Sequence, residues 1–249
     1  MKSINSLEEM LKLSPTKSRA FIPTMGALHQ GHLSLIQAAQ EKHDEIVVSI
    51  FVNPTQFNQS TDLENYPRDI ESDKKKLESL GVDILFLPNF EQMYPDNYHF
   101  KITENEFSKK LCGAHRPGHF DGVLSIVMKL FNIVKPQEAF FGEKDFQQFQ
   151  LLKGMVEAFF MDLKITSVKT KREESGLAMS SRNLLLSGQE KEVAPELYKN
   201  LSNTNLSAIE IKQNLEAKGF RLEYLEEIDG RRYIAAHLGN VRLIDNVSI

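Results

Sequence analysis

The sequence predicts an α/β protein in which helices cover both faces of a parallel sheet, followed by a small α+β domain. Over the first two thirds of the chain, short β-branched or aromatic runs alternate with longer stretches of helical spacing, as in βαβ units. After Lys171 this alternation gives way to a polar helical stretch and short strand-like pieces. The length of 249 residues suffices for one large domain or for a main domain and a smaller one.

The expected elements of the main domain follow one another as strand and helix. Residues 20–22 and 46–52 are predicted strands, and apolar residues at helical spacing between them predict a crossover helix over about 32–42. A charged helix over 69–80 stops at Gly81. The later expectations are strand 83–87, helix 121–134, strand 138–141, a helix over about 145–160 and strand 163–168. Right-handed crossovers are expected, but the strand order is not readable from the sequence.

The second domain is predicted from a change of character near Thr170. Charged residues mark this point, and we expect domains at 1–170 and 171–249. Residues 190–218 are helical and polar, whereas 221–225 and 233–236 have strand-like composition.

Composition excludes several classes of protein. The hydrophobic fraction is 41%, the charged fraction is 26%, and no apolar run approaches the length of a membrane span. Acidic residues lie where a secretory signal would have its apolar segment, so the expected location is cytoplasmic. A net charge of -4 argues against a nucleic-acid-binding surface. Cys112 is the only cysteine, which rules out an internal disulfide framework and a cysteine-rich zinc site.

The segment 21–32, FIPTMGALHQGH, carries the first chemical signal. A strand ends, a loop with two glycines follows, and a helix begins; this arrangement turns backbone N–H groups and the positive end of a helix dipole towards a phosphate. His29 and His32 are three residues apart, so both rings can point to one side of the first turn and donate to a triphosphate. A zinc site lacks an obvious third ligand, and a helix cap alone needs fewer of these residues.

The glycine spacing matches neither the phosphate loop of kinases nor the fingerprint of NAD enzymes. It resembles instead the His-x-Gly-His motif of the nucleotidyltransferase superfamily, which class I aminoacyl-tRNA synthetases share. That resemblance implies attack on the α-phosphate of ATP and a Rossmann-like sheet, without naming the second substrate.

Further segments resemble one family within this superfamily, the pantoate–β-alanine ligases (pantothenate synthetases). The resemblance extends from about Pro23 to the end of the chain. Its segments, in order, are PTMGALHQGHLSLI (23–36), FVNPTQF (51–57), RPGHFDGV (116–123), FFGEKDFQQ (140–148), GLAMSSRN (176–183) and RLIDN (242–246).

The resemblance implies ATP-dependent joining of (R)-pantoate to β-alanine through a pantoyl adenylate, with release of AMP and pyrophosphate. It implies that ATP is bound by Met25, Gly26, Ala27, Leu28, His29, Gln30, Gly31, His32, Gly142, Glu143, Lys144, Asp145, Lys171, Met179, Ser180, Ser181 and Arg182. Four of these are the expected catalytic residues: His32, His29, Lys144 and Arg182. Gln56 and Gln148 are the implied pantoate ligands, because neutral amides donate to a carboxylate without competing as nucleophiles. Mg²⁺ is expected with the nucleotide, and a homodimer by analogy.

Two further residues are secondary candidates, and three features depart from the family pattern. Arg116 and Tyr66 are candidates for the substrate pocket or for structural roles. The family commonly has aspartate at Ser175 and an apolar residue at Lys171, and the chain is shortened between 228 and 234. Two alternatives stay open: another His-x-Gly-His nucleotidyltransferase, in which a phosphate attacks, and a catalytically silent nucleotide-binding protein on the same fold.

Overall fold

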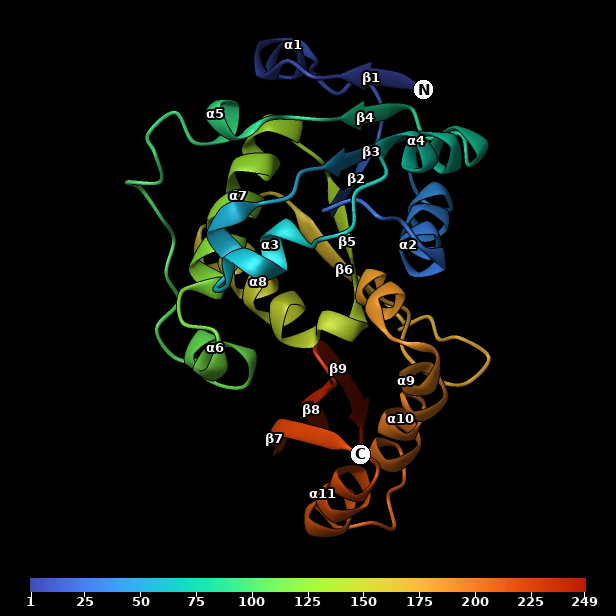
Figure 1. Ribbon diagram of the computed structural model, residues 1–249. Coiled ribbons are helices and arrows are strands. Elements are labelled where there is room, and N and C mark those ends of the chain that lie inside the picture. The colour runs from blue at the N-terminus through green and yellow to red at the C-terminus, as the bar shows by residue number, and fades with distance from the viewer. The chain divides into compact units, whose positions relative to one another are not determined.

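The computed structural model describes residues 1–249, which form two compact units. Unit 1 consists of Met1–Gly142 and Gln147–Val168, and unit 2 of Glu143–Phe146 and Lys169–Ile249 (Figure 1). Glu143–Phe146 therefore groups with the C-terminal residues, although the sequence alone places it within 1–170. The boundary at residue 170 and a lid role for the C-terminal domain stay predictions.

Unit 1 contains a six-stranded sheet in which every pair of neighbours is parallel, in the order β1-β4-β3-β2-β5-β6. The predicted parallel sheet is confirmed. Its strands are β1 (Lys2–Ile4), β2 (Arg19–Thr24), β3 (Glu45–Ile50), β4 (Ile84–Phe86), β5 (Glu138–Gly142) and β6 (Lys164–Val168).

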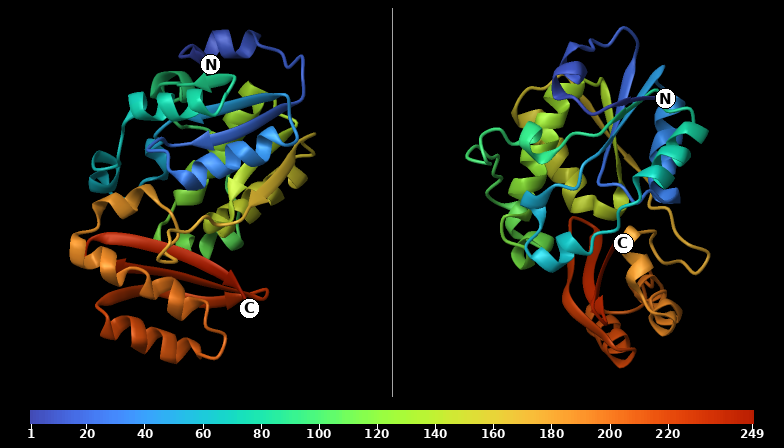
Figure 2. Two further views of the ribbon diagram at one scale, coloured as in Figure 1. Left: turned by 90° about the vertical axis from the view of Figure 1, so that its right-hand side faces the viewer. Right: turned by 45° about the horizontal axis from the view of Figure 1, so that its top comes forward.

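Helices cover both faces of this sheet. α2 and α4 lie over one face, and α7 and α8 over the other (Figure 2). The helices up to β6 are α1 (Leu7–Lys12), α2 (Gln30–Gln40), α3 (Ser60–Glu64), α4 (Ile70–Ser79), α5 (Phe90–Met93), α6 (Cys112–His115), α7 (His119–Val134) and α8 (Phe146–Ala158), with 3-10 turns η1 (Pro54–Gln56), η2 (Phe107–Lys109) and η3 (Glu143–Asp145). None of the helices has the length and apolar character of a membrane span.

The alternation of side chains along β2 explains how both faces are filled. Ala20 and Ile22 are fully buried in the cluster that includes α2 and α4. Phe21 points to the other side, where its ring meets Phe131 of α7 edge-on at a centroid distance of 6.3 Å. Because side chains of a strand alternate, a strand buried on both faces has a continuous apolar run, as β2 does.

The strand order reverses at β2. From β2 the chain proceeds to β3 and β4 on one side, and α7 then returns it to β5 on the other side of β2. Ala20 pairs with Glu138 and Phe21 with Ala139, so the carboxyl ends of β2 and β5 are neighbours. Open α/β sheets bind ligands at such a reversal.

Unit 2 has its own core around a three-stranded antiparallel sheet, β7 (Phe220–Ile228), β8 (Arg231–Leu238) and β9 (Val241–Ser248). α9 (Gly188–Val193), α10 (Glu196–Leu201) and α11 (Ala208–Ala217) accompany it, with the 3-10 turn η4 (Ser181–Leu185). The helical stretch predicted over 190–218 is thus divided. Pro195 stands at the cap between α9 and α10, where its fixed φ and missing N–H separate two helices.

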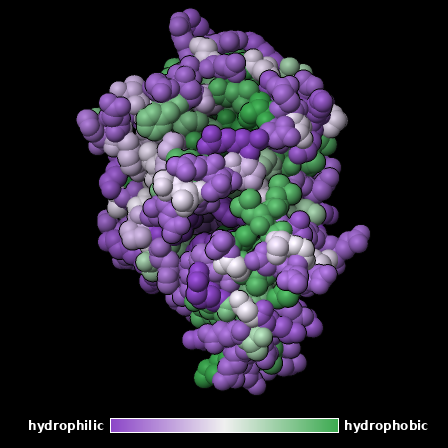
Figure 3. Space-filling view, in the orientation of Figure 1, coloured by the Kyte–Doolittle hydropathy of each residue, from purple (hydrophilic) through white to green (hydrophobic).

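Several element boundaries differ from the sequence predictions. β1, α1 and β9 lie outside the elements that the sequence predicts, and the three residues of β1 are too few to show a pattern. α7 begins at His119, two residues early, after Gly118 adopts a left-handed φ of +79°. On the face in Figure 3, hydrophilic residues cover most of each unit and hydrophobic ones form smaller patches.

Candidate functional site

The loop between β2 and α2 needs glycine at its second residue. Gly26 has a φ of +81°, a region that side-chain-bearing residues rarely adopt. A Cβ there would lie 3.0 Å from Ile50 Cγ2 and 3.2 Å from the buried Asp73 Oδ2. The Gly26 N–H donates to Thr24 Oγ1 at 3.2 Å. The end of β2 thereby turns sharply into the segment that precedes the histidines.

His29 and His32 cap α2 with one ring nitrogen each. His29 Nδ1 accepts the N–H of Gly31 at 3.1 Å, and His32 Nδ1 accepts the N–H of His29 at 3.3 Å. A nitrogen that accepts a backbone N–H carries no hydrogen, so each neutral ring has its hydrogen on Nε2. The ring centroids are 4.1 Å apart. Two Nε2–H donors thus stand together at the positive end of a helix.

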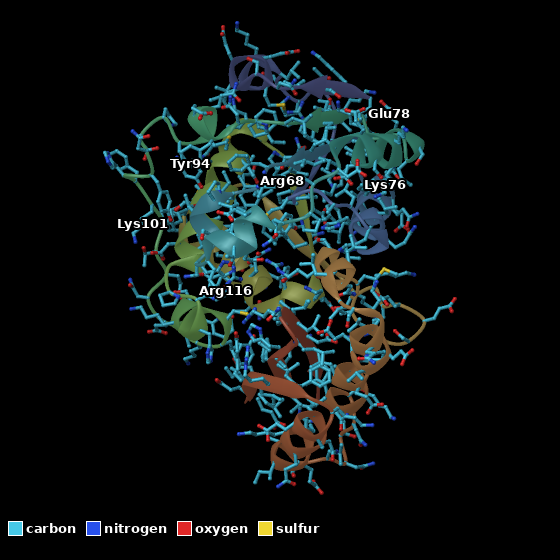
Figure 4. All side chains as sticks on the ribbon, in the orientation of Figure 1. Arg68, Lys76, Glu78, Tyr94, Lys101 and Arg116 are labelled. Carbon is cyan, nitrogen blue, oxygen red and sulfur yellow. The ribbon has the colours of Figure 1, made fainter.

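α4 fixes this loop through one residue, Leu28. Asp73, whose side chain is fully buried, accepts the Leu28 N–H at 2.8 Å on Oδ1. Lys76, one turn later and labelled in Figure 4, donates its ammonium to the Leu28 carbonyl at 2.7 Å and lies 3.6 Å from Asp73. Both backbone polar groups of a buried residue are therefore satisfied by α4.

Gln56 lies next to the same loop. Its Nε2 is 3.0 Å from the sulfur of Met25, and its Oε1 accepts from Asn53 Nδ2 at 3.1 Å. The turn η1 packs directly against α7 at Gly122, where there is no room for a side chain. A Cβ on Gly122 would lie 2.6 Å from the Thr55 carbonyl oxygen and 2.8 Å from Gln56 N.

Asn53 organises the surroundings of Gln56. Its Oδ1 accepts hydrogen bonds from the hydroxyl of Tyr94 at 2.8 Å and from Thr55 Oγ1 at 3.0 Å. Burial raises the pKa of Tyr94 to about 12, against the opposing effect of hydrogen bonds with Thr55 and Asn53. The phenol consequently stays protonated at neutral pH and can donate to Asn53.

The secondary candidates Arg116 and Tyr66 have different surroundings. Arg116, labelled in Figure 4, donates from Nη2 to the Gln56 carbonyl at 3.1 Å. The buried His119 shares that carbonyl through Nδ1 at 2.8 Å. Arg116 therefore supports the backbone beneath Gln56. Tyr66 is buried with its ring edge-on to Phe57 at 5.8 Å, a packing contact.

Gln147 and Gln148 are neighbours on α8, and Gln147 hydrogen-bonds to the backbone of another segment. The buried Gln147 accepts the Cys112 N–H and donates to the carbonyls of Phe107 and Lys110. Gln148, the predicted pantoate ligand, is half-buried one residue later in the first turn. Gly142 ends β5, beside the carboxyl end of β2.

In unit 2, the predicted nucleotide residues Glu143, Lys144 and Asp145 form the short turn η3. Asn246 of β9 donates its amide to the carbonyls of Glu143 at 2.8 Å and Lys144 at 2.9 Å. Lys144 Nζ lies 3.8 Å from Asp145 Oδ1, so the lysine head is only loosely paired within this turn.

The other predicted nucleotide residues of unit 2 lie on a connected second segment. The Met179 N–H donates to the carbonyl of Lys171 at 3.0 Å, which closes a loop. Ser180 Oγ accepts the Arg182 N–H at 3.3 Å. Asn183 then donates its amide to Glu173 and to the carbonyl of Ala178, at 2.7 and 3.1 Å. Residues 171–183 are thus one connected segment.

The structure brings the predicted residues together in two groups. Residues 25–32 and Gln56 are joined by contact in unit 1, whereas Lys144, Lys171 and Arg182 belong to segments of unit 2. Seven side chains that the sequence did not single out hold these segments through hydrogen bonds: Asn53, Asp73, Lys76, His119, Arg172, Asp245 and Asn246. Asn53, His119, Asp245 and Asn246 lie inside the family motifs, but Asp73 and Lys76 lie on a helix whose sequence shows only charge. No group of three or more His, Cys, Asp or Glu side chains is arranged to hold a metal ion.

Comparison with known proteins agrees with this geometry. The family model for pantoate-beta-alanine ligase matches residues 1–248. A pantothenate synthetase of Bdellovibrio bacteriovorus is 56% identical over 229 residues, which cover 92% of this chain and 91% of that protein. One of Legionella pneumophila is 48% identical over 250 residues, or 99% of both chains.

Solved structures give the same result. The pantoate-beta-alanine ligase of Francisella tularensis, solved with beta-gamma ATP and beta-alanine, matches with a TM-score of 0.92 and 39% identity, covering 100% of this chain and 97% of that one. Pantothenate synthetase of Thermus thermophilus matches with a TM-score of 0.91 and 37% identity, covering 100% and 99%. These matches support the ligase prediction over both alternatives, a different nucleotidyltransferase and a silent nucleotide-binding protein. The chain belongs to the pantoate-beta-alanine ligase family.

Proposed function

We propose that the chain condenses (R)-pantoate with β-alanine at the expense of ATP, which is cleaved to AMP and pyrophosphate. The observation that carries this proposal is the pair of histidines whose Nδ1 atoms accept backbone N–H groups at the start of α2. Both rings then have Nε2–H groups for the oxygens of a triphosphate, at a helix end that favours negative charge. Family membership supplies the identity of the acceptor and the amine.

The first step activates a carboxylate, which is a poor electrophile on its own. A carboxylate oxygen of pantoate attacks the α-phosphorus of ATP, the bond to the bridging oxygen of pyrophosphate breaks, and pantoyl adenylate forms. His29 and His32 donate hydrogen bonds to the phosphate oxygens as charge moves onto the leaving group. Gln56 and Gln148 bind pantoate; Gln56 suits this because Asn53 already fixes its Oε1.

The second step forms the amide. The free amine of β-alanine attacks the acyl carbon of the adenylate, AMP leaves with the bonding electron pair, and the nitrogen loses a proton. The rate of this step depends on holding the adenylate and the amine in contact. Residues that order the surroundings of the substrates therefore contribute to the rate through positioning. Asp73 and Lys76 hold the backbone of the loop at Leu28, and Asn53 holds the side chain of Gln56.

The predicted nucleotide residues of unit 2 supply positive charge. We propose that Lys144 and Arg182 neutralise the triphosphate, with Gly142, Glu143, Asp145, Lys171, Met179, Ser180 and Ser181 as further ATP contacts. A lysine acts on phosphate as a point charge, and an arginine can donate two parallel hydrogen bonds. Mg²⁺ would accompany the nucleotide, held by phosphate oxygens and water, because no cluster of three protein ligands is present.

We propose further that the chain forms a homodimer, by analogy with the family, and that its location is cytoplasmic. Analytical ultracentrifugation of the purified chain tests the first, with an expected mass of about twice the 28.4 kDa of the chain. Cell fractionation tests the second, with the expected signal in the fraction that contains neither membranes nor secreted proteins.

Isotope exchange between pyrophosphate and ATP tests the function directly. The chain should exchange label only when pantoate is present, since the reverse of the first step needs the adenylate. Gln148→Ala should raise the KM for pantoate by about tenfold and leave that for ATP nearly unchanged, as expected for the loss of one or two hydrogen bonds. Gln150→Ala, at an exposed position of α8, is the control. Exchange without pantoate, or none at all, contradicts the proposal.

A further inference from the structure

The two nucleotide segments of unit 2 meet at adjacent residues of one strand. Asn246 of β9 holds the turn with Glu143 and Lys144 through two amide hydrogen bonds of 2.8 and 2.9 Å. Its neighbour Asp245 accepts both arms of the Arg172 guanidinium, at 2.6 and 3.0 Å. Arg172 stands next to Lys171, at the start of the other segment.

Both contacts are buried and specific. Asp245 and Asn246 are 3% and 5% exposed, and a bidentate arginine–carboxylate pair is the strongest geometry for such a bond. Asp245 Oδ1 also accepts the backbone N–H of Asn246 at 2.8 Å, which ties the Asp245 side chain to the backbone of its neighbour. Removing either partner from a buried pair leaves a polar group unsatisfied, so the arrangement is held in one geometry.

Aromatic stacking reinforces each end. The Arg172 guanidinium lies 3.5 Å above the centre of the Tyr198 ring of α10, and that of Arg231 lies 3.7 Å above the ring of Phe146. Arg231 in turn donates to Asn246 Oδ1. These contacts explain why Glu143–Phe146 groups with unit 2 rather than with the strand and helix that flank it.

We propose that Asp245 and Asn246 are positioning residues that join the Lys144 turn and the 171–183 segment into one nucleotide-binding body. Neither side chain needs to touch ATP; they act through Lys144 and through the segment that leads to Arg182. This inference rests on the proposed function, because it assumes that both segments bind ATP. It predicts an effect on the nucleotide that a general loss of stability does not produce.

Asn246→Asp is the sharpest variant. It keeps the side-chain shape and the oxygen that accepts from Arg231, but puts an oxygen where the amide donated to the carbonyls of Glu143 and Lys144. The KM for ATP in pyrophosphate exchange should rise about tenfold, equivalent to about 1.4 kcal/mol. The KM for pantoate should stay within about twofold, because Gln56 and Gln148 are untouched. Asp245→Asn should have the same signature.

A double variant tests whether Asn246 acts through the lysine. In a Lys144→Ala background, Asn246→Asp should raise the KM for ATP by less than twofold, because the group that it positions is gone. Glu223→Gln is the matched control. Glu223 pairs with Arg242 and His237 on the same sheet at 2.8 Å each, but contacts neither nucleotide segment. It should lower the melting temperature and leave the KM for ATP unchanged.

The outcomes separate this inference from the proposed function. If the wild-type chain shows no pantoate-dependent exchange, the function fails first. If the wild type exchanges label and Asn246→Asp keeps the wild-type KM for ATP, the positioning role is overturned. An equal rise in both KM values, or a full effect in the Lys144→Ala background, also overturns it.

Discussion

Each of the two histidines at the start of α2 uses Nδ1 to complete the helix cap. In the neutral ring the cap thereby places the hydrogen on Nε2. That is the tautomer which the proposed donation to a phosphate oxygen requires. Structural and catalytic contributions of one residue can be separated with substituents that imitate one nitrogen at a time.

We predict different effects for His32→Asn and His32→Gln. Asparagine places an amide oxygen near the position of Nδ1 but nothing at the position of Nε2, so it should lower pantoate-dependent exchange by about 10²–10³-fold with little change in stability. Glutamine reaches towards Nε2 and can also accept the His29 N–H, as Gln92 accepts that of Asn89 in α5, so it should keep both the cap and more of the activity. Steady-state exchange and urea unfolding measure the two quantities. Wild-type activity in His32→Asn would remove Nε2 from the mechanism.

Among the elements, α4 does more than cover the sheet. Asp73 and Lys76 satisfy the N–H and carbonyl of Leu28, so the helix sets the path of the loop that leads to His29. Asp73→Ala should cost about 1–3 kcal/mol of stability and also raise the KM for ATP, because the loop loses its buried acceptor. Asp69→Ala removes the N-cap of the same helix, which accepts from Ser72 N. It should cost about 1 kcal/mol without changing the KM for ATP; equal KM effects would contradict the loop assignment.

The contact between α7 and η1 depends on the missing side chain of Gly122. In Gly122→Ala the new methyl would meet backbone atoms of Thr55 and Gln56 at 2.6–2.8 Å, which must move. We expect a loss of about 1–3 kcal/mol by urea unfolding and a raised KM for pantoate. Gly154→Ala, in an exposed part of α8 with open space around it, is the control and should gain about 0.5–1 kcal/mol. If Gly122→Ala left the free energy of unfolding unchanged, α7 and η1 could separate without a loss of stability.

For the whole molecule, two carboxylates with lowered pKa values, one in each unit, contribute to stability against acid. Burial alone would raise the pKa of Glu138, but hydrogen bonds from Thr166, His43 and Lys164 outweigh it and lower the pKa. Burial likewise opposes the lowering of the Glu223 pKa by Arg242 and His237. A carboxyl with a lowered folded-state pKa stabilises the fold above its unfolded pKa of about 4.3, and this contribution is lost as pH falls further.

The urea midpoint should therefore fall as pH drops from about 5 towards 3. Glu138→Gln should be less stable at pH 7 but show a flatter dependence over this window, because a neutral amide has no proton to gain. Urea titrations at several pH values, followed by circular dichroism, measure both slopes. A variant that declines as steeply as the wild type would show that Glu138 does not drive the acid transition.

Much of the fold follows from local patterns. The strand–helix alternation predicted the parallel sheet, because period and composition are properties of neighbouring residues, and β2, β3 and β5 were each expected close to their final bounds. Elements without a pattern were missed: β1 is three residues long, and α1 has six. Strand order also lay beyond reach, because pairing between β2 and β5 joins residues more than a hundred positions apart.

The candidate site, like the fold, could be predicted from the sequence only in part. By itself the sequence determined the family motifs, and these led to the proposal that the glycine-flanked histidines, the lysine and the arginine bear the chemistry. Only the tertiary structure decided which nitrogen of each ring is the donor, that Asp73 and Lys76 hold Leu28, and that Glu143–Phe146 joins unit 2 through Asn246. Those outcomes depend on hydrogen bonds between distant segments, and a pattern within a single segment carries no information about the partner that the fold will bring to it.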